Sequence, residues 1–172
     1  AEIRLLGEGG RPVPDGVVGE AFVRSPLVFH GYLNAPERTA LCLKDGWFRT
    51  EDLMYRDAEG YYYMMGRKRD MIKSGGENVY AQEVEDVLRN HPAIFDCALI
   101  GVEEAVGAAI VLRPGCTLSA DELLEHCRGR LPSFKKPRYW AVMDKLPEND
   151  MGKVQKNILR RDAASLFVKL EG

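Results

Sequence analysis

The sequence predicts an α+β fold made of two parts. Up to residue 66, short apolar runs alternate with turn residues at regular spacing, which is typical of a small β-barrel-like subdomain. After residue 78, apolar residues recur at helical spacing between strand-like runs, which indicates a compact α+β domain of short sheets and about three helices. The segment between them is rich in charge and glycine. We therefore expect a β subdomain over residues 1–68, a hinge over 69–73 and an α+β domain over 74–172.

The composition suits a folded protein with a core. Of the 172 residues, 45% are hydrophobic and 29% are charged, so a core can form and disorder is not expected. A formal net charge of −2 gives no general electrostatic reason to bind nucleic acid or an anionic membrane. The sequence has no signal peptide and no apolar run long enough to span a bilayer. The chain opens on a strand-like stretch without an initiator Met, which suggests a fragment.

The cysteines indicate a reducing compartment. They form no C-x-x-C pair and do not have the spacing of metal ligands, so we predict free thiols, no metal site and a cytoplasmic protein. The three histidines are scattered and have no nearby nucleophile, so we interpret them as structural. These residues are Cys42, Cys97, Cys116 and Cys127, and His30, His91 and His126.

The first part reads as strands joined by turns. Glu2–Leu6 alternates as a strand, and the glycines at 7–10 predict a turn rather than a phosphate loop, because neither a G-K-[S/T] motif nor a helix follows. Pro36–Leu41 is expected as a short helix, with proline in the first turn where its missing N–H costs nothing. The other expected strands are Gly19–Ser25, Gly46–Thr50, Leu53–Arg56 and Gly60–Gly66, with a turn at Asp57–Gly60.

The second part alternates helices and strands. Ala81–Asn90 has apolar residues at helical spacing, and His91-Pro92 ends this helix. Ser119 and Glu122 predict a capping box that opens a helix through Arg130. The remaining expected elements are strands at Phe95–Val102, Ala108–Leu112 and Arg138–Met143, a loop at Leu146–Lys153 and a terminal helix beginning with Val154–Arg161.

The segment Gly66–Val79 joins the two parts. Arg67 to Asp70 reads as a flexible joint, because charged residues stay solvated in more than one orientation. Ser74-Gly75-Gly76 reads as a tight turn, since two glycines allow positive φ and can present bare N–H groups to a ligand.

Four stretches carry a family resemblance across nearly the whole chain. They are Gly31–Thr39, Gly46–Asp52, Gly66–Val79 and Leu146–Val154. In this order they resemble the C-terminal portion of the adenylate-forming enzymes, which include acyl- and aryl-CoA synthetases, luciferases and peptide-synthetase adenylation domains. The resemblance implies a distal β subdomain followed by a mobile C-terminal lid.

The resemblance also implies roles in adenylation. Asp52 matches the aspartate that accepts hydrogen bonds from both ribose hydroxyls of ATP, and Arg67 matches an arginine near the ribose and phosphates. Glu51 departs from the family, which usually has glycine there, and this puts the local backbone in doubt. Lys153 matches the lysine that stabilises charge developing between the substrate carboxylate and the α-phosphate. Asp70 matches the hinge residue about which the lid rotates.

A second set of residues would act after that rotation. Ser74, Gly75 and Gly76 would line a tunnel for the pantetheine arm of coenzyme A, with Glu77 following. In some relatives the stretch matching Phe134 and Lys136 stacks an aromatic ring on the CoA adenine and binds its phosphates. The alternative for this stretch is a buried phenylalanine beside solvated lysines.

The implied function is the C-terminal part of an ATP-dependent carboxylic acid–CoA ligase. Its co-substrates would be ATP with Mg²⁺ and CoA, and its substrate a carboxylic acid. The family's phosphate loop, adenine pocket and acyl pocket belong to a preceding N-terminal domain, so we expect the chain alone to be inactive. The link at Glu103–Gly107 is shorter than in relatives, which indicates a truncated hairpin or missing residues. Two alternatives stay open: a non-catalytic module that binds a nucleotide, CoA or a partner protein, and an adenylation domain from another branch of the family.

Overall fold

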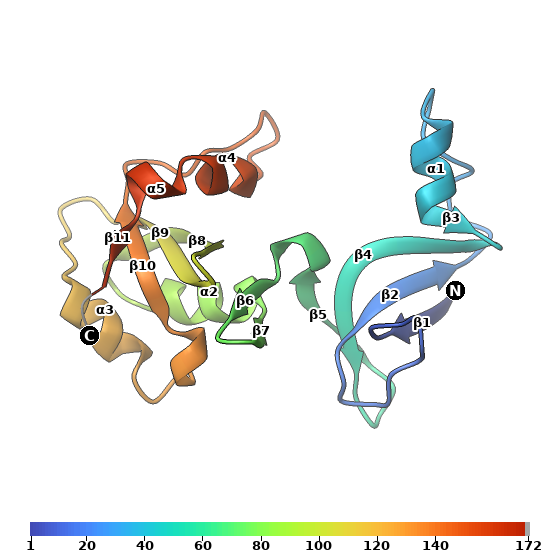
Figure 1. Ribbon diagram of the computed structural model, residues 1–172, viewed down its shortest axis with the longest axis horizontal. Coiled ribbons are helices and arrows are strands. Elements are labelled where there is room, and N and C mark those ends of the chain that lie inside the picture. The colour runs from blue at the N-terminus through green and yellow to red at the C-terminus, as the bar shows by residue number, and fades with distance from the viewer. Residues whose placement is uncertain (171–172) are drawn as a thin grey trace. The chain divides into compact units, whose positions relative to one another are not determined.

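The computed structural model describes residues 1–170, which form two compact units (Figure 1). The first unit runs from Ala1 to Arg69, and the second begins at Asp70. Their mixture of helices and sheets confirms the predicted α+β class. No helix within residues 1–170 is long and apolar enough to cross a membrane.

The first unit is a curled antiparallel sheet. Its strands are β1 (Glu2–Leu6), β2 (Gly19–Arg24), β3 (Leu43–Lys44), β4 (Trp47–Arg56) and β5 (Tyr62–Arg67). They follow the order β1-β2-β4-β3, with β5 also paired to β4, and helix α1 (Pro36–Cys42) precedes β3. Strand β4 bends strongly along its length (Figure 1), and its first half pairs with β3 while its second half pairs with β5.

Strand β4 is continuous, and the prediction of two strands at Gly46–Thr50 and Leu53–Arg56 is wrong. The apparent break is a bulge in which residues 50–52 lie opposite Ala21 alone. The Thr50 hydroxyl closes the bulge. It donates to the Ala21 carbonyl at 2.9 Å and accepts the N–H of Asp52 at 3.0 Å.

The second unit is built on a four-stranded sheet of order β11-β10-β9-β8, in which only β9 and β10 are parallel. Its elements in chain order are β6 (Ile72–Ser74), β7 (Glu77–Val79), α2 (Ala81–Arg89), β8 (Ile94–Val102), β9 (Ala105–Leu112), α3 (Ala120–Cys127), β10 (Pro137–Val142), α4 (Lys156–Arg161), α5 (Ala163–Leu166) and β11 (Val168–Lys169). Two single-turn 3-10 helices, η1 (Lys68–Asp70) and η2 (Ser133–Lys135), stand at the junction of the units and before β10.

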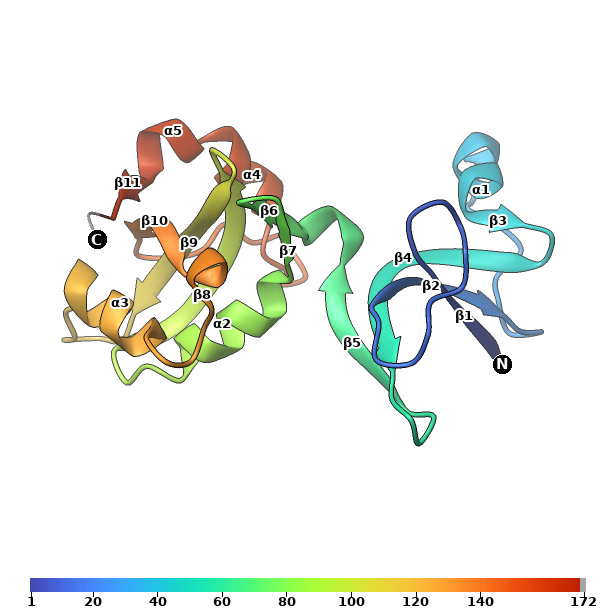
Figure 2. The ribbon, with the colours of Figure 1, turned by 60° about the horizontal axis from the view of Figure 1, so that its bottom comes forward.

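Helices cover both faces of this sheet (Figures 1 and 2). Along β8, Cys97 and Leu99 pack in one core cluster with side chains of α2 and α3. The alternate residues Ala98 and Ile100 pack in a second cluster with Leu159 of α4. Because side chains alternate along a strand, β8 separates an α2/α3 face from an α4/α5 face.

A two-residue turn joins β8 and β9. Glu103 and Glu104 form this turn, with φ of 46° and 56°. Strand β9 therefore starts at Ala105, whereas the prediction placed its start at residue 108. Gly107 lies inside this strand and not in a turn. A Cβ at this position would lie only 2.7 Å from the Val102 side chain, so close packing requires the glycine.

Two helix predictions need correction. The Ser119–Glu122 capping box is confirmed, but α3 ends at Cys127 and not at Arg130, since the backbone is already extended at Arg128 and Gly129 adopts a φ of 75°. The terminal helix is divided into α4 and α5, and β11 follows it. The second unit thus has four α-helices within the described residues, where about three were expected.

The cysteines are free thiols, as predicted. Burial raises the pKa of the Cys97 thiol to about 12 and that of Cys127 to about 11, so both side chains behave as small core residues. Within residues 1–170, no group of three or more His, Cys, Asp and Glu side chains could hold a metal ion.

Candidate functional site

Asp52 and Arg67 lie opposite each other on β4 and β5. Arg67 Nε is 2.8 Å from Asp52 Oδ1, and the Asp52 side chain is 17% exposed. This oxygen is buried and lies against Arg67 in the ion pair, yet it accepts no hydrogen bond from the part of the chain that the structure describes. Because buried carboxylate oxygens are nearly always hydrogen-bonded, the Asp52 carboxylate keeps capacity for a further hydrogen bond.

The bulge before Asp52 keeps a glycine-like backbone although the residue is glutamate. Glu51 has a φ of 62°, which lies in the left-handed region that side chains other than glycine rarely adopt. The Thr50 hydroxyl, bound to the Asp52 N–H, fixes this conformation from one side. Glutamate therefore occupies a position whose backbone conformation favours glycine.

The loop that carries Lys153 is closed at its base by the main chain. The Gln155 N–H donates to the Pro147 carbonyl at 2.7 Å, and Glu148 forms a β-bridge with Val154. The Gln155 side-chain amide also donates to the Glu148 carbonyl at 3.0 Å. The loop is therefore a narrow hairpin ending at the start of α4.

The tip of this loop is organised by Asn149. Its Oδ1 accepts the N–H groups of Met151 at 3.0 Å and Lys153 at 2.9 Å, and its own N–H donates to the Lys153 carbonyl at 2.9 Å. Gly152 takes the left-handed conformation, with φ of 71°. The Lys153 side chain is exposed and makes no ion pair with any residue from 1 to 170. The Lys153 ammonium thus makes no ion pair within residues 1–170, while hydrogen bonds to Asn149 fix the backbone of Lys153.

Ion pairs hold both sides of the junction between the units. Lys68 Nζ is 2.8 Å from Glu20 Oε2 in the first unit, and Arg160 Nη2 is 2.9 Å from Asp70 Oδ1 in the second. Burial opposes ionisation of Glu20, but hydrogen bonds from Arg49 and Lys68 outweigh it, so the pKa of this carboxyl lies below its ordinary value. The expected hinge residue Asp70 is therefore attached to α4. Motion over residues 69–73 stays a prediction.

The Ser74-Gly75-Gly76-Glu77 stretch is the turn of the β6–β7 hairpin. Gly75 and Gly76 have φ of 59° and 84°, which confirms the expected positive values. A Cβ at either position would meet nothing within 4 Å, so the backbone conformation alone requires the glycines. Ser74 is buried, and the other three residues are exposed.

Phe134 and Lys136 lie in and just after η2, which packs beside β7 and β9. Phe134 is half-buried against the α2/α3 core cluster. Lys135 is not solvated, because its Nζ lies 2.6 Å from both carboxylate oxygens of Glu83. The structure thus brings the η2 segment next to the glycine hairpin and leaves Lys136 half-buried.

The chain is similar to known proteins in both sequence and fold. Residues 83–153 match the family described as AMP-binding enzyme C-terminal domain. A feruloyl-CoA synthase from Amycolatopsis is 42% identical over 165 residues, which are 93% of this chain and 34% of that protein. The ATP-bound structure of MatB from Rhodopseudomonas palustris is 38% identical with a TM-score of 0.84, and the match covers 93% of this chain and 33% of MatB. The amide bond synthetase McbA from Marinactinospora thermotolerans is 35% identical with a TM-score of 0.84, over 93% of this chain and 34% of McbA.

The chain is similar over nearly its whole length to the C-terminal portion of the adenylate-forming enzymes. It spans about a third of the length of the curated relatives it matches. The relatives include CoA ligases named for different acids, such as ferulate and indoleacetate.

Two expected sites of the second unit lie on opposite faces of its sheet. Ile72 and Val79, which flank the glycine turn, belong to the α2/α3 core cluster. Leu146 and Val154, which flank the Lys153 loop, belong to the α4/α5 cluster. One domain therefore presents a lysine on one face and a glycine hairpin on the other.

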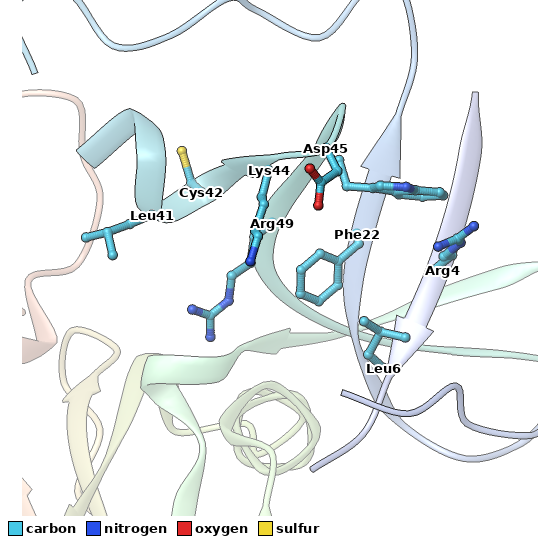
Figure 3. A pocket seen from close by; sticks show the side chains of 9 residues that line it. Arg4, Leu6, Phe22, Leu41, Cys42, Lys44, Asp45 and Arg49 are labelled. Atoms are coloured by element: carbon cyan, nitrogen blue, oxygen red, sulfur yellow. The ribbon is translucent and has the colours of Figure 1, made fainter. Parts of the chain in front are cut away.

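A pocket of about 250 Å³ lies in the first unit (Figure 3), and none of the candidate catalytic or binding residues lines it. Its wall combines apolar and basic side chains around Trp47, whose ring is 4.1 Å from Arg4 and 4.7 Å from Arg24 (guanidinium carbon to ring centroid). The lining residues are Arg4, Leu6, Phe22, Leu41, Cys42, Lys44, Asp45, Trp47 and Arg49.

The sequence analysis missed Glu85, the buried charge of α2. Its carboxylate binds Lys156, three residues beyond Lys153. A signal was present, since Ala81, Val84, Glu85 and Leu88 follow the i, i+3, i+4, i+7 spacing of one helix face, and all four are buried. A glutamate within an apolar stripe requires a partner, although the sequence does not say which one.

Proposed function

We propose that this chain is the C-terminal part of an ATP-dependent carboxylic acid–CoA ligase. The whole enzyme would bind a carboxylic acid and Mg-ATP, and carboxylate attack on the α-phosphorus would form an acyl-adenylate and release pyrophosphate. The thiol of CoA would then attack the acyl carbonyl, giving the thioester and AMP. The observation that carries this proposal is the placement of Lys153 and the glycine hairpin on opposite faces of one domain.

Lys153 would serve the first half-reaction. Negative charge grows on the phosphoryl oxygens as the carboxylate attacks, and an exposed ammonium on an ordered loop can stabilise it. Removing one such electrostatic contact costs about 100-fold or more in rate. Acylation of Lys153 would remove the positive charge and have the same effect.

Asp52 and Arg67 would bind the nucleotide. The Asp52 carboxylate, whose Oδ1 accepts no hydrogen bond within the described chain, would accept hydrogen bonds from the ribose hydroxyls. Arg67 keeps half of its side chain exposed and can reach the ribose or the phosphates with its other N–H groups. Mg²⁺ would enter bound to the phosphates of ATP.

The opposite face would serve thioester formation. The Ser74-Gly75-Gly76 turn carries no bulky side chain, so a pantetheine arm could run along its backbone, followed by Glu77. The neighbouring η2 segment would contribute Phe134 and Lys136 to the adenine and phosphates of CoA. Rotation about Asp70, within residues 69–73, would exchange the two faces at the active site of a preceding N-terminal domain. The free thiols fit a cytoplasmic enzyme.

The test begins with carboxylate-dependent pyrophosphate release from Mg-ATP, using acetate, octanoate and benzoate. We expect the chain alone to be silent and activity to require the preceding domain, supplied in the same polypeptide or in trans. Lys153→Ala should abolish pyrophosphate release but spare thioester formation from a supplied acyl-adenylate. Lys169→Ala removes another exposed lysine of the same unit and serves as the matched control. Equal loss of both half-reactions in Lys153→Ala would refute the division between the two faces.

A second candidate follows from the similarity to McbA, which is described as an amide bond synthetase. In that case the acyl-adenylate would form identically, but an amine and not CoA would accept the acyl group. Measuring AMP release with CoA and with simple amines separates the two. A non-catalytic binding module would instead bind ATP or CoA without turnover, whether or not Lys153 is replaced.

A further inference from the structure

Glu85 and Lys156 form a buried ion pair beneath the Lys153 loop. Lys156 Nζ lies 2.7 Å from Glu85 Oε1, and the side chains are 16% and 6% exposed. Glu85 Oε1 also accepts the Leu99 N–H at 2.9 Å. Leu99 belongs to β8, the edge strand of the sheet, so the carboxylate satisfies an N–H that no neighbouring strand can reach. Three elements, α2, β8 and α4, thus meet at one carboxylate.

Stability is a weak explanation for such a pair. Removing two charges from water carries a large penalty, and a well-packed apolar pair of the same volume is often equally stable. What an ion pair with additional hydrogen bonds does supply is a fixed geometry. The ion pair therefore restricts the position of the Lys156 side chain more than apolar packing alone would.

Lys156 is also the first residue of α4 and follows directly on the Lys153 loop. The chain is fixed before the loop by Leu146, which is 3% exposed in the α4/α5 core cluster. It is fixed after the loop by the Lys156–Glu85 pair. Between these points, the Gln155 N–H bond to Pro147 joins the two arms. The direction in which the tip presents Lys153 depends on both fixed points.

We propose that Lys156 is a positioning residue for adenylation, and that its ion pair with Glu85 sets where the Lys153 ammonium is held. This inference rests on the proposed function of Lys153. Displacing a catalytic group by about 1 Å can cost about 100-fold in rate. Lys156 itself is mostly buried and committed to Glu85, so it acts through Lys153 and not on the substrate.

Arg89 provides a matched control. Its Nη2 lies 3.5 Å from Glu85 Oε2 and donates to the Cys97 carbonyl at 3.1 Å, so it is a second cation at the same carboxylate. Arg89 lies on α2 and contacts β8. Within residues 1–170 its partners are Glu85, Asp86, Asp96 and Cys97, none of which belongs to the Lys153 loop. Arg89→Met should therefore affect stability without redirecting Lys153.

The kinetic test uses the full-length polypeptide that contains this chain. We expect Lys156→Met to lower kcat for adenylation by about 10- to 100-fold, with thioester formation from a supplied acyl-adenylate unchanged. Lys156→Arg should restore most of the rate, and Arg89→Met should preserve the balance of the two half-reactions. In the double variant Lys153→Ala/Lys156→Met, the loss should equal that of Lys153→Ala alone. Multiplied losses, or an equal fall in both half-reactions, would overturn the proposal.

Failure of the proposed function would look different, because Lys153→Ala would then leave adenylation intact. If Lys156→Met does not fold, Glu85→Gln/Lys156→Met removes both charges and takes its place.

Hydrogen exchange of the backbone amides of residues 149–153 in the chain tests the positioning role without turnover. These amides should exchange faster in the Lys156 variant and at the parental rate in Arg89→Met. Unchanged exchange in both variants would contradict the positioning role whatever the activity.

Discussion

Arg160 of α4 holds Asp70 at the start of the second unit, with Nη2 2.9 Å from Oδ1 across 90 positions of sequence. Both residues belong to the second unit, so the pair would travel with that unit in any rotation about the junction. Lys68, two positions earlier, is paired to Glu20 within the first unit. The two ion pairs therefore lie on either side of Arg69, and each is contained within one unit.

The Arg160–Asp70 ion pair should contribute a small but measurable coupling energy to stability. Its side chains are 36% and 21% exposed, so solvent screening limits the pair to a coupling energy of about 0.2–1 kcal/mol. A double-mutant cycle of Arg160→Gln and Asp70→Asn, read by urea unfolding with Trp140 fluorescence, measures this energy. Replacing Asp70→Asn in the cycle by Asp144→Asn, an exposed aspartate elsewhere in the unit, should give no coupling.

Glu51→Gly should stabilise the first unit. A side chain at φ 62° costs about 1–2 kcal/mol, while glycine adds about 0.5–1 kcal/mol of unfolded-state entropy, so we expect a net gain of about 0.5–1 kcal/mol. In a Trp140→Phe background, Trp47 is the only tryptophan and reports on this unit alone.

The control for that variant is Glu59→Gly in the β4–β5 turn. Glu59 is not among the residues with positive φ, so glycine there brings only the entropic cost and should destabilise by about 0.5–1 kcal/mol. If both glycines destabilise equally, the left-handed backbone at Glu51 does not carry the strain assigned to it.

Glu20 should make the first unit sensitive to acid. Its folded-state pKa is lowered, because the hydrogen bonds from Arg49 and Lys68 outweigh the effect of burial. The stabilisation is therefore fully present above the carboxyl's ordinary pKa and is lost as pH falls through the lowered value. Trp47 fluorescence during urea unfolding, measured from neutral to acidic pH, follows this loss.

The variant Glu20→Gln separates this carboxyl from the others. It should lower the free energy of unfolding by about 1–3 kcal/mol at neutral pH, because charge-assisted hydrogen bonds are replaced by neutral ones. The difference from the parent chain should shrink as the pH falls and Glu20 becomes protonated. A difference that stays constant down to strongly acidic pH would show that the titration belongs to other groups.

Local patterns predicted the elements well because their causes are local. The Ser119–Glu122 capping box and the paired glycines at 75 and 76 act within a few residues, and the structure contains both. The two strands predicted at Gly46–Thr50 and Leu53–Arg56 are one strand, β4, with a bulge between them. Only pairing with Ala21 of β2, far away in sequence, keeps the strand continuous.

For the candidate site, too, the sequence predicts local features better than long-range contacts. Lys153 and Asp52 could be selected from motifs, but the contacts that hold them could not. Glu85 and Lys156 are 71 positions apart, and the sequence around either residue does not indicate that the other is its partner. The apolar stripe of α2 predicts that Glu85 is buried, yet the partner follows only from how α2, β8 and α4 pack.

Gly107, in the β8–β9 hairpin, should not accept a side chain without a loss of stability. A Cβ there would meet Val102 at 2.7 Å and the Phe167 ring at 3.2 Å, so Gly107→Ala should destabilise the second unit by about 1–3 kcal/mol. Gly101→Ala, on the opposite strand, is the matched control, since its Cβ would meet only Ile72 at an ordinary 3.5 Å and its φ is not positive. Urea unfolding followed by Trp140 fluorescence should show a large loss for the first variant and little for the second. Equal losses would mean that glycine matters in this hairpin for its flexibility, and not for the contact between β9 and the ring of Phe167.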